Sequence, residues 1–190
     1  MIAMVLIIIS GLFQSENKTE IQRYEVIKSD KDFEIRYYPP AILASVEMGG
    51  TYDQSRSSSF SVLAGYIFGG NEQGMQISMT APVRMTEKNR MMSFVMPSHF
   101  QMGDLPKPKN NQVTIHSSEP AIVASVRFGG WANEKKIAEM KQKLDKWLND
   151  KGIKHSGNFE YLGYDAPFRM TNRRNEVVVS LEGYQPDQSF

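Results

Sequence analysis

The sequence of 190 residues contains no cysteine, which excludes disulfides, thiolate metal sites and a cysteine nucleophile. It has only three histidines, His99, His116 and His155, and their spacing is not that of metal ligands on one helix. The formal charge is +1 and the basic clusters are short, which argues against a nucleic-acid-binding surface. The sequence also lacks nucleophile-elbow, phosphate-loop, dinucleotide-binding and zinc motifs. These absences remove the common enzyme signatures.

A long hydrophobic segment of membrane-spanning length is also lacking. Residues 2–13 are almost wholly apolar and residues 14–18 are polar, which is the length of a signal-peptide core rather than the roughly 20 residues of a spanning helix. We therefore expect residues 1–18 to be an export signal or an N-terminal tail, and residues 19–190 to form one domain without a membrane span. The protein is expected to be exported, either periplasmic or membrane-associated through this segment, with a cytoplasmic location as the alternative.

The chain repeats itself at a spacing of about 80 residues. Residues 40–50 and 120–130 are identical at eight of eleven positions, and residues 77–85 are echoed by residues 164–170. Two copies are too few for a solenoid, so we infer an internal duplication with halves of about 33–97 and 112–181. Two halves of this kind are expected to pack about a pseudo-twofold axis.

Hydrophobic periodicity predicts the same order of elements in both halves. Alternating residues predict strands, and spacings of three and four predict a helix opened by Thr51, with Phe60 to Phe68 on its apolar face, and a second helix opened by Asn133. The expected strands are 24–26, 33–37, 41–48, 75–79, 92–96, 113–115, 121–128, 159–163 and 176–181. Each half therefore reads β-α-β-β, which predicts an α+β fold whose antiparallel sheet curls into a partial barrel covered by two helices.

Several segments, in this order, resemble the SOUL heme-binding protein family. They are Tyr24–Val26, Phe33–Ala41, Met79–Val83, Ser93–Ser98, Leu105–Pro108, Val126–Gly130, Tyr164–Pro167 and Arg173–Val177. The resemblance covers roughly residues 24–181. It implies a distorted antiparallel β-barrel flanked by two helices, as in small-molecule effector-binding domains. It also implies non-enzymatic binding of heme, or of a related tetrapyrrole or other flat hydrophobic molecule, in a shallow apolar groove beside the first helix.

On this resemblance, Arg56 is the expected partner of a heme propionate. The expected lining of the groove is Val62, Tyr66, Met85, Phe168 and Met170. Tyr37 stands where some family members carry a histidine proposed as the axial ligand. It can ligate ferric iron as a phenolate, and the alternative is an inward-facing strand aromatic. The twelve methionines are interpreted first as core filling, then as an adaptable ligand groove, and last as soft metal ligands.

Two further functions remain as alternatives to ligand binding. Glu176 begins the last strand, and a carboxylate partly buried in a barrel would have a raised pKa and can act as a general base in a cofactor-free hydrolase or isomerase. The structural alternative is an ion pair of Glu176 with Arg84, Arg169 or Arg174. The other function is a protein-interaction module of an exported protein that uses the connection of residues 97–111. We favour the non-enzymatic reading.

Overall fold

The computed structural model describes residues 19–49, 52–166 and 169–186, with the side chains of helix α1 described from residue 56 onward. The predicted export signal, the Thr51 cap and Phe168 lie outside these residues. Within the described residues there are two α-helices, α1 (Tyr52–Ile67) and α2 (Glu134–Asp150), and a short 3₁₀ helix, η1 (Met102–Asp104). The strands are β1 (Glu20–Ile21), β2 (Glu25–Asp30), β3 (Phe33–Tyr38), β4 (Ile42–Glu47), β5 (Thr80–Ala81), β6 (Val83–Thr86), β7 (Met91–Val95), β8 (Thr114–Ser117), β9 (Ala121–Phe128), β10 (His155–Gly163) and β11 (Asn175–Leu181).

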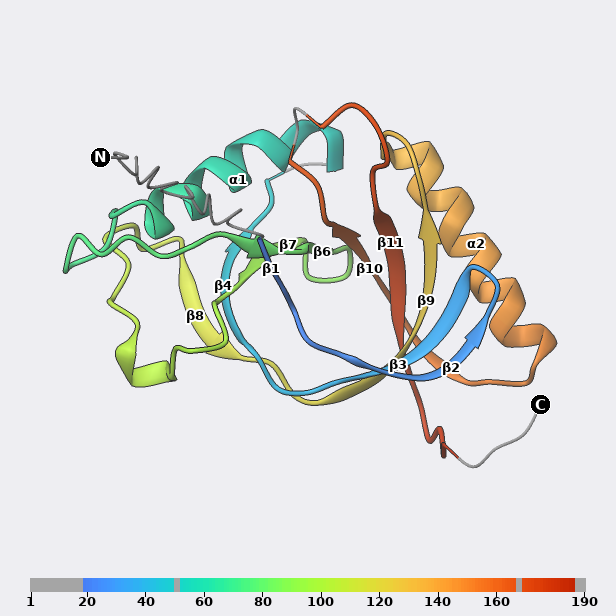
Figure 1. Cartoon of the computed structure of the whole chain (residues 1–190). Helices are drawn as coiled ribbons and strands as arrows, with labels where there is room; N and C mark the ends of the chain where they lie inside the picture. Colours follow the sequence, from blue (N-terminus) through green and yellow to red (C-terminus); the bar gives the residue numbers. More distant parts are fainter. Residues whose placement is uncertain (1–18, 50–51, 167–168, 187–190) are drawn as a thin grey trace, which may run out of the picture.

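Nine strands form one antiparallel sheet in the order β2-β3-β9-β11-β10-β6-β7-β4-β8, and β1 pairs in parallel with β5 (Figure 1). Outward from the β10–β6 contact, the strands β10-β11-β9 on one side correspond to the strands β6-β7-β4 on the other. Along the chain, a helix follows both β4 and β9. At this contact Tyr161 of β10 lies opposite Met85 of β6. This arrangement places Met85 and Tyr161 where the two halves of the sheet, β2-β3-β9-β11-β10 and β6-β7-β4-β8, meet.

One face of the sheet packs against both helices. The stripe of α2 predicted from the sequence is buried through Ile137, Leu144 and Leu148, and the Asn133 side chain caps the helix by accepting a hydrogen bond from the Lys136 amide. Residues of α1 and alternate residues of the strands, among them Val177 and Val179 of β11, join the same hydrophobic core. The helices contact different strands, α1 meeting β4 and β7 while α2 meets β9, β10 and β11. A cleft is therefore left between them.

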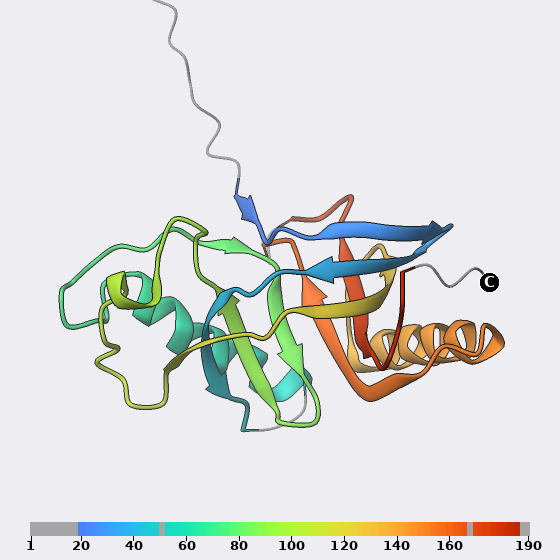
Figure 2. The same cartoon turned by 90° about the horizontal axis from the view of Figure 1, so that it is seen from below.

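The opposite face is concave, but the sheet does not close into the predicted barrel. Its edges are β2 and β8, which are not paired with each other (Figure 2). Closure needs two edges that meet in register along their length. Here β8 has only four residues, and the register of β2 shifts between Val26 and Lys28, which bends an edge strand. The expectation of an α+β fold with two helices on an antiparallel sheet is confirmed, and the expectation of a barrel is wrong.

The segment after α1 also differs from the prediction. Residues 75–79 do not form the expected strand, because the Asn71 side chain binds the backbone of Tyr66 and Met75 and holds a turn there. The helix ends at Ile67, so Phe68 leaves the apolar face and is 59% exposed. The connection of residues 97–111 packs on this end of α1, where the Tyr66 hydroxyl donates to the Pro106 carbonyl at 3.0 Å. The connection is thus an ordered part of the domain.

Candidate functional site

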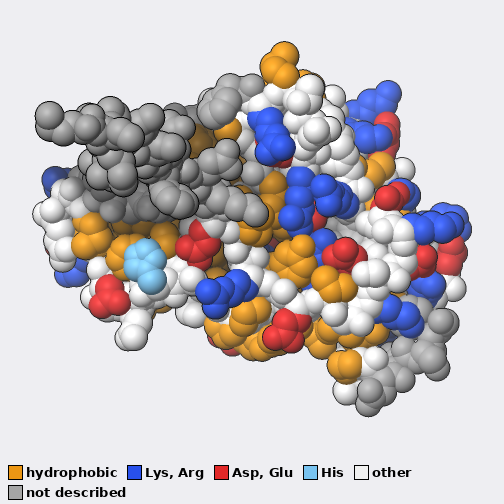
Figure 3. All heavy atoms as spheres, in the orientation of Figure 1, with side chains coloured by type: hydrophobic (Ala, Val, Ile, Leu, Met, Phe, Trp, Pro, Cys, Tyr) orange, Lys and Arg blue, Asp and Glu red, His pale blue; other side chains and the backbone are white. Residues whose placement is uncertain are grey.

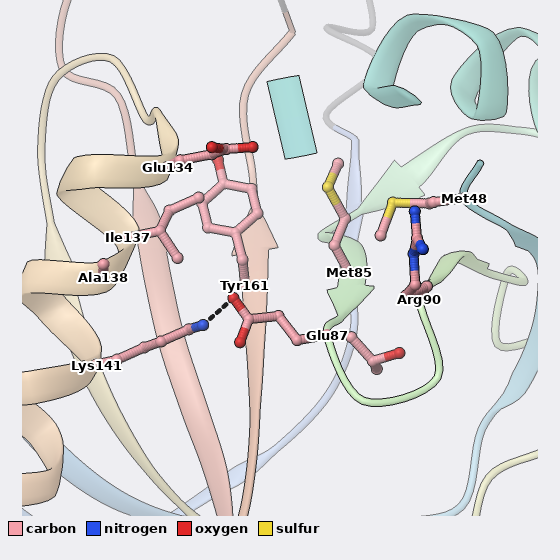
Figure 4. A pocket seen from close by; sticks show the side chains of 10 residues that line it. Met48, Met85, Glu87, Arg90, Glu134, Ile137, Ala138, Lys141 and Tyr161 are labelled. Carbon is pink, nitrogen blue, oxygen red and sulfur yellow. Dashed lines mark ion pairs between the residues drawn. The ribbon is translucent and has the colours of Figure 1, made fainter. Parts of the chain in front are cut away.

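Two hollows lie in the cleft between the helices and share Met85 and Tyr161 as their floor. The hollow beside α2, of about 500 Å³, is drawn in Figure 4. Ile137 and Lys141 stand on its α2 side and Met48 and Met85 on the other, with Tyr161 between them. The hollow beside α1 measures about 320 Å³. Since they share two residues, the hollows form one cleft that runs from α1 to α2 over the junction of the halves.

The α2 hollow has an apolar floor and a charged rim. Lys141 reaches from α2 and forms an ion pair with Glu87 of the β6–β7 turn. The hydroxyl of Tyr161 donates to Asn175 Oδ1 at 2.6 Å, so this polar end is engaged and the ring is presented to the cleft. The floor therefore offers ring and thioether surface, which suits a flat apolar molecule.

The α1 hollow carries two cations at its walls. Arg56, Ser57, Phe60 and Ser61 of α1 form one side, and the other lining residues are Val83, Met85, Tyr161, Gly163, Asp165 and Arg173. Gly163 leaves space here, because a Cβ at this position would lie 3.1 Å from the Tyr161 hydroxyl. The hollow thus combines an apolar floor with two positively charged side chains that an anionic group of a ligand can contact.

Arg173 is held in a fixed position at this wall. Its Nη1 donates to the carbonyls of Ala166 at 3.0 Å and Arg169 at 2.8 Å, and its guanidinium lies over the Trp131 ring at 4.3 Å. Its Nε is buried and has no hydrogen-bond partner. A buried donor without an acceptor costs free energy, so the protein itself does not satisfy every donor of this guanidinium.

Of the predicted site residues that the structure describes, Arg56 and Met85 lie together in the α1 hollow and the others lie elsewhere. Val62 packs against the core from α1, and Tyr66 is 2% exposed beneath the connection. Met170 is 74% exposed, and Tyr37 is half-buried on β3 opposite Ile122; neither lines the two hollows. Sequence reasoning missed Tyr161 and Arg173. The alternation of residues 159–163 was a signal for Tyr161, but Arg173 resembled ordinary loop charge.

Glu176 lies on the opposite face of the sheet and is fully buried. Arg36 donates to both of its carboxylate oxygens at 2.6 and 3.1 Å, Arg174 Nε donates at 2.9 Å, and the Tyr164 hydroxyl donates at 3.0 Å. The predicted ion pair with Arg174 is therefore present, whereas the partner Arg36 was not foreseen. The other two arginines considered bind elsewhere, Arg84 to Glu160 and Arg169 to Asp165.

This environment lowers the pKa of Glu176, whereas a buried general base would have a raised pKa. Burial by itself would raise the pKa, but the hydrogen bonds and charge of Arg36, followed by those of Arg174, outweigh it and lower the pKa of Glu176. Burial, with a contribution from the Glu176 charge, raises the pKa of the Tyr164 hydroxyl. A carboxylate with a lowered pKa and four donors accepts a proton poorly. The arrangement is that of a structural ion cluster.

The histidines do not assemble a metal centre. His99 is exposed and packs on Phe100, and His155 pairs with Asp145 at 3.1 Å. Within the described ranges there is no group of three histidine or carboxylate side chains that could hold a metal ion. In the same part of the chain, no helix has the length and apolar character needed to cross a membrane.

Comparisons with known proteins found relatives of this chain. The family model described as SOUL heme-binding protein matches residues 19–180. Heme-binding protein 1 of Xenopus laevis is 30% identical over 165 residues, covering 80% of this chain and 86% of the relative. Heme-binding protein 2 of Homo sapiens is 31% identical over 156 residues, covering 76% of each chain.

Solved structures share the architecture at low sequence identity. The EcmrR C-terminal domain aligns with a TM-score of 0.57 at 14% identity, covering 79% of this chain and 96% of that one. A Listeria innocua protein described as a hydrolase aligns with a TM-score of 0.56 at 6% identity, covering 80% and 92%. These similarities establish the same kind of fold, and they assign no activity to this chain.

Proposed function

The chain belongs to the SOUL heme-binding protein family, and on that premise we propose that it binds heme or a related tetrapyrrole at a site that catalyses no reaction. The proposed site is the cleft between α1 and α2, centred on the α1 hollow. The observation that carries the proposal is the shared floor of Met85 and Tyr161 beside Arg173, whose Nε is a buried donor without a partner.

The residues present fit the shape and charge of a tetrapyrrole. A porphyrin ring is flat and apolar, and it contacts aromatic and thioether surface favourably. Phe60, Val83, Met85 and Tyr161 would contact the ring. Arg56 and Arg173 would each meet a carboxylate, since guanidinium binds carboxylate through charge-assisted hydrogen bonds. This deepens the prediction for Arg56 and Met85 and adds a second cation.

The cleft does not offer a histidine to the iron. Among the described residues, the lining of the two hollows contains no imidazole, and the Tyr161 hydroxyl donates its hydrogen bond to Asn175. The thioethers of Met48 and Met85 are the soft donors nearby. We therefore expect the tetrapyrrole to bind through contacts to its ring and to its carboxylates. When the ligand is heme, its iron would supply redox chemistry. Tyr37 as an iron ligand remains a separate prediction.

A hemin titration of the full chain, followed by the Soret band, tests the site with a matched pair of variants. Ser61 and Ser58 are both exposed on α1, but only Ser61 lines the hollow. Ser61→Trp puts an indole into the hollow and should weaken binding by roughly tenfold or more, equivalent to ~1.4 kcal/mol. Ser58→Trp, as the control, should bind as the parent does. Equal affinities of the two variants would remove the α1 hollow as the site.

Two further titrations examine the roles of charge and iron. Arg173→Gln should weaken hemin binding, because a neutral amide replaces the cation, while Arg127→Gln is a control outside the α1 hollow. Iron-free protoporphyrin IX should bind within a few-fold of hemin if ring and carboxylate contacts dominate. A much weaker affinity for protoporphyrin IX would instead show that a protein ligand to iron carries the binding.

A further inference from the structure

The concave face of the sheet, opposite the heme cleft, contains a separate hollow of about 320 Å³. Side chains from eight strands line it. One wall is largely apolar and includes Tyr38, Val123, Leu162 and Val178. The facing wall, built by β4, β6, β7 and β8, is polar and includes Ser45, Ser93, Arg84 and His116. This difference between the walls is the pattern of a small-molecule site with an apolar pocket and convergent polar groups.

The polar wall contains a continuous chain of hydrogen bonds. Ser93 Oγ lies 2.7 Å from Ser45 Oγ, and Ser45 Oγ lies 2.9 Å from His116 Nε2. The other ring nitrogen, Nδ1, lies 3.3 Å from the Ser117 carbonyl oxygen. A carbonyl can only accept, so the network assigns the proton to Nδ1 and leaves the Nε2 lone pair for the Ser45 hydroxyl. Ser93 then donates to Ser45, and every donor in this hydrogen-bond network has an acceptor.

From this geometry we infer that Ser45 is a nucleophile and His116 its general base, in an esterase site that acts on small, uncharged esters. A hydroxyl within hydrogen-bond reach of a base that is itself oriented by a third group is the arrangement that activates serine. Here the orienting group is the Ser117 carbonyl. Sheet pairing fixes the neighbours, because Ser45 lies opposite Ser93 across β4–β7 and Ser93 lies opposite Arg84 across β7–β6.

The reaction balances with water as the only co-reactant. Ser45 Oγ forms a bond to the ester carbonyl carbon while His116 Nε2 takes the hydroxyl proton. The tetrahedral intermediate breaks its bond to the alcohol oxygen, which leaves with the proton from Nε2. Water, deprotonated by the same nitrogen, then attacks the acyl-serine, and the carboxylic acid is released with the serine restored. As Ser45 Oγ bonds to the carbonyl carbon, the Ser93 hydroxyl beside it would turn from Ser45 and donate to the developing oxyanion.

The dimensions and openings of the hollow define the substrate class. A volume of about 320 Å³ admits a short acyl group against the apolar wall and excludes long fatty acyl chains. His116 is exposed, so the alcohol has a route to solvent beside the base. Arg84 is already paired with Glu160 at 2.7 Å, which makes this wall close to neutral and favours an uncharged ester over a carboxylate.

The second half of the chain uses the corresponding positions differently. In the sequence repeat Ser125 corresponds to Ser45, and Ser125 lies opposite Val178 across β9–β11 as Ser45 lies opposite Ser93 across β4–β7. Ser125 donates to the Glu34 carbonyl, and the Val178 side chain has no polar group. The equivalent sites are thus committed to structure in one half, while the first half keeps two hydroxyls and an imidazole on the hollow. This asymmetry favours a separate use for the first half.

A fluorophosphonate probe tests the proposal on the full chain, with the labelled residue found by mass spectrometry of the intact protein and its peptides. We expect one label, on Ser45, and hydrolysis of p-nitrophenyl acetate that falls by roughly 100-fold or more in His116→Gln. His99→Gln is the matched control, because His99 is exposed and does not line the hollow. Ser45→Ala should lose the label.

Hemin titration of the same variants separates this proposal from the proposed function. The two sites lie on opposite faces of the sheet, so Ser45→Ala and His116→Gln should retain the Soret shift, which also reports that they are folded. Absence of a label on Ser45, or labelling that is undiminished in folded His116→Gln, would overturn the inference. Loss of hemin binding in Ser61→Trp with labelling intact would leave both proposals standing.

Discussion

Replacing Glu176 with glutamine should be among the most destabilising conservative changes in the protein. The Glu176 side chain is fully buried and balances Arg36, whose side chain is 3% exposed, and part of the charge of Arg174. Removing one partner of a buried ion pair costs about 3–5 kcal/mol, because the other charge stays buried. Glutamine keeps one acceptor oxygen, and Glu34 still pairs with Arg36 at 2.6 Å, so we expect the lower end, ~3 kcal/mol.

Urea unfolding followed by tryptophan fluorescence measures this loss. Trp147 is a suitable probe, because its ring stacks on Phe33 at 4.8 Å and its Nε1 donates to Asp30. In a chain of this size ~3 kcal/mol corresponds to a fall in Tm of roughly 6–12 °C. Glu160→Gln is the control, because its ion pair with Arg84 is partly exposed and such pairs contribute about 1 kcal/mol or less. Equal losses in the two variants would refute the reasoning.

The acid dependence of stability provides an independent check on the same cluster. The pKa of Glu176 is lowered in the folded protein from its ordinary value of 4.5, so its contribution is fully present above pH 4.5 and is lost as the pH falls through the lower, folded value. The difference in unfolding free energy between parent and Glu176→Gln should therefore shrink below pH 4.5. A difference that stays constant down to acid unfolding would contradict the lowered pKa.

Three other substitutions, together with one control substitution, test the packing that positions the two sites. Leu144→Ala on α2 should cost about 2–5 kcal/mol by creating a cavity, because this leucine is fully buried. Gly70→Ala should cost roughly 1–3 kcal/mol, since its Cβ would lie 2.5 Å from a backbone carbonyl oxygen of α1, whereas Gly49→Ala meets nothing within 4 Å and should be nearly neutral. Asn133→Ala should cost ~1 kcal/mol through loss of the α2 cap. Urea midpoints measure all four, and an equal effect of the two glycine variants would contradict the contact.

Much of the local structure follows from the sequence because it depends on short-range patterns. Alternation gave the strand of residues 121–128 with its observed bounds, and the stripe after Asn133 gave a helix with that residue as its cap. The same reasoning failed where a side chain competed with strand pairing for backbone hydrogen bonds. Asn71 binds the backbone of Met75, and residues 75–79 do not form a strand. Periodicity cannot report such a local competition.

The sequence by itself determined the α+β class, the family and the repeat, because these reside in residue order and spacing. Tertiary structure alone decided which residues share a site. Met85 meets Tyr161, Glu176 meets Arg36, and Ser45 meets His116 only because strands far apart in the chain are paired in one register. A shift of one residue would turn each side chain to the other face of the sheet. Long-range strand pairing, which no local pattern encodes, likewise left β2 and β8 as the two unpaired edges of the sheet.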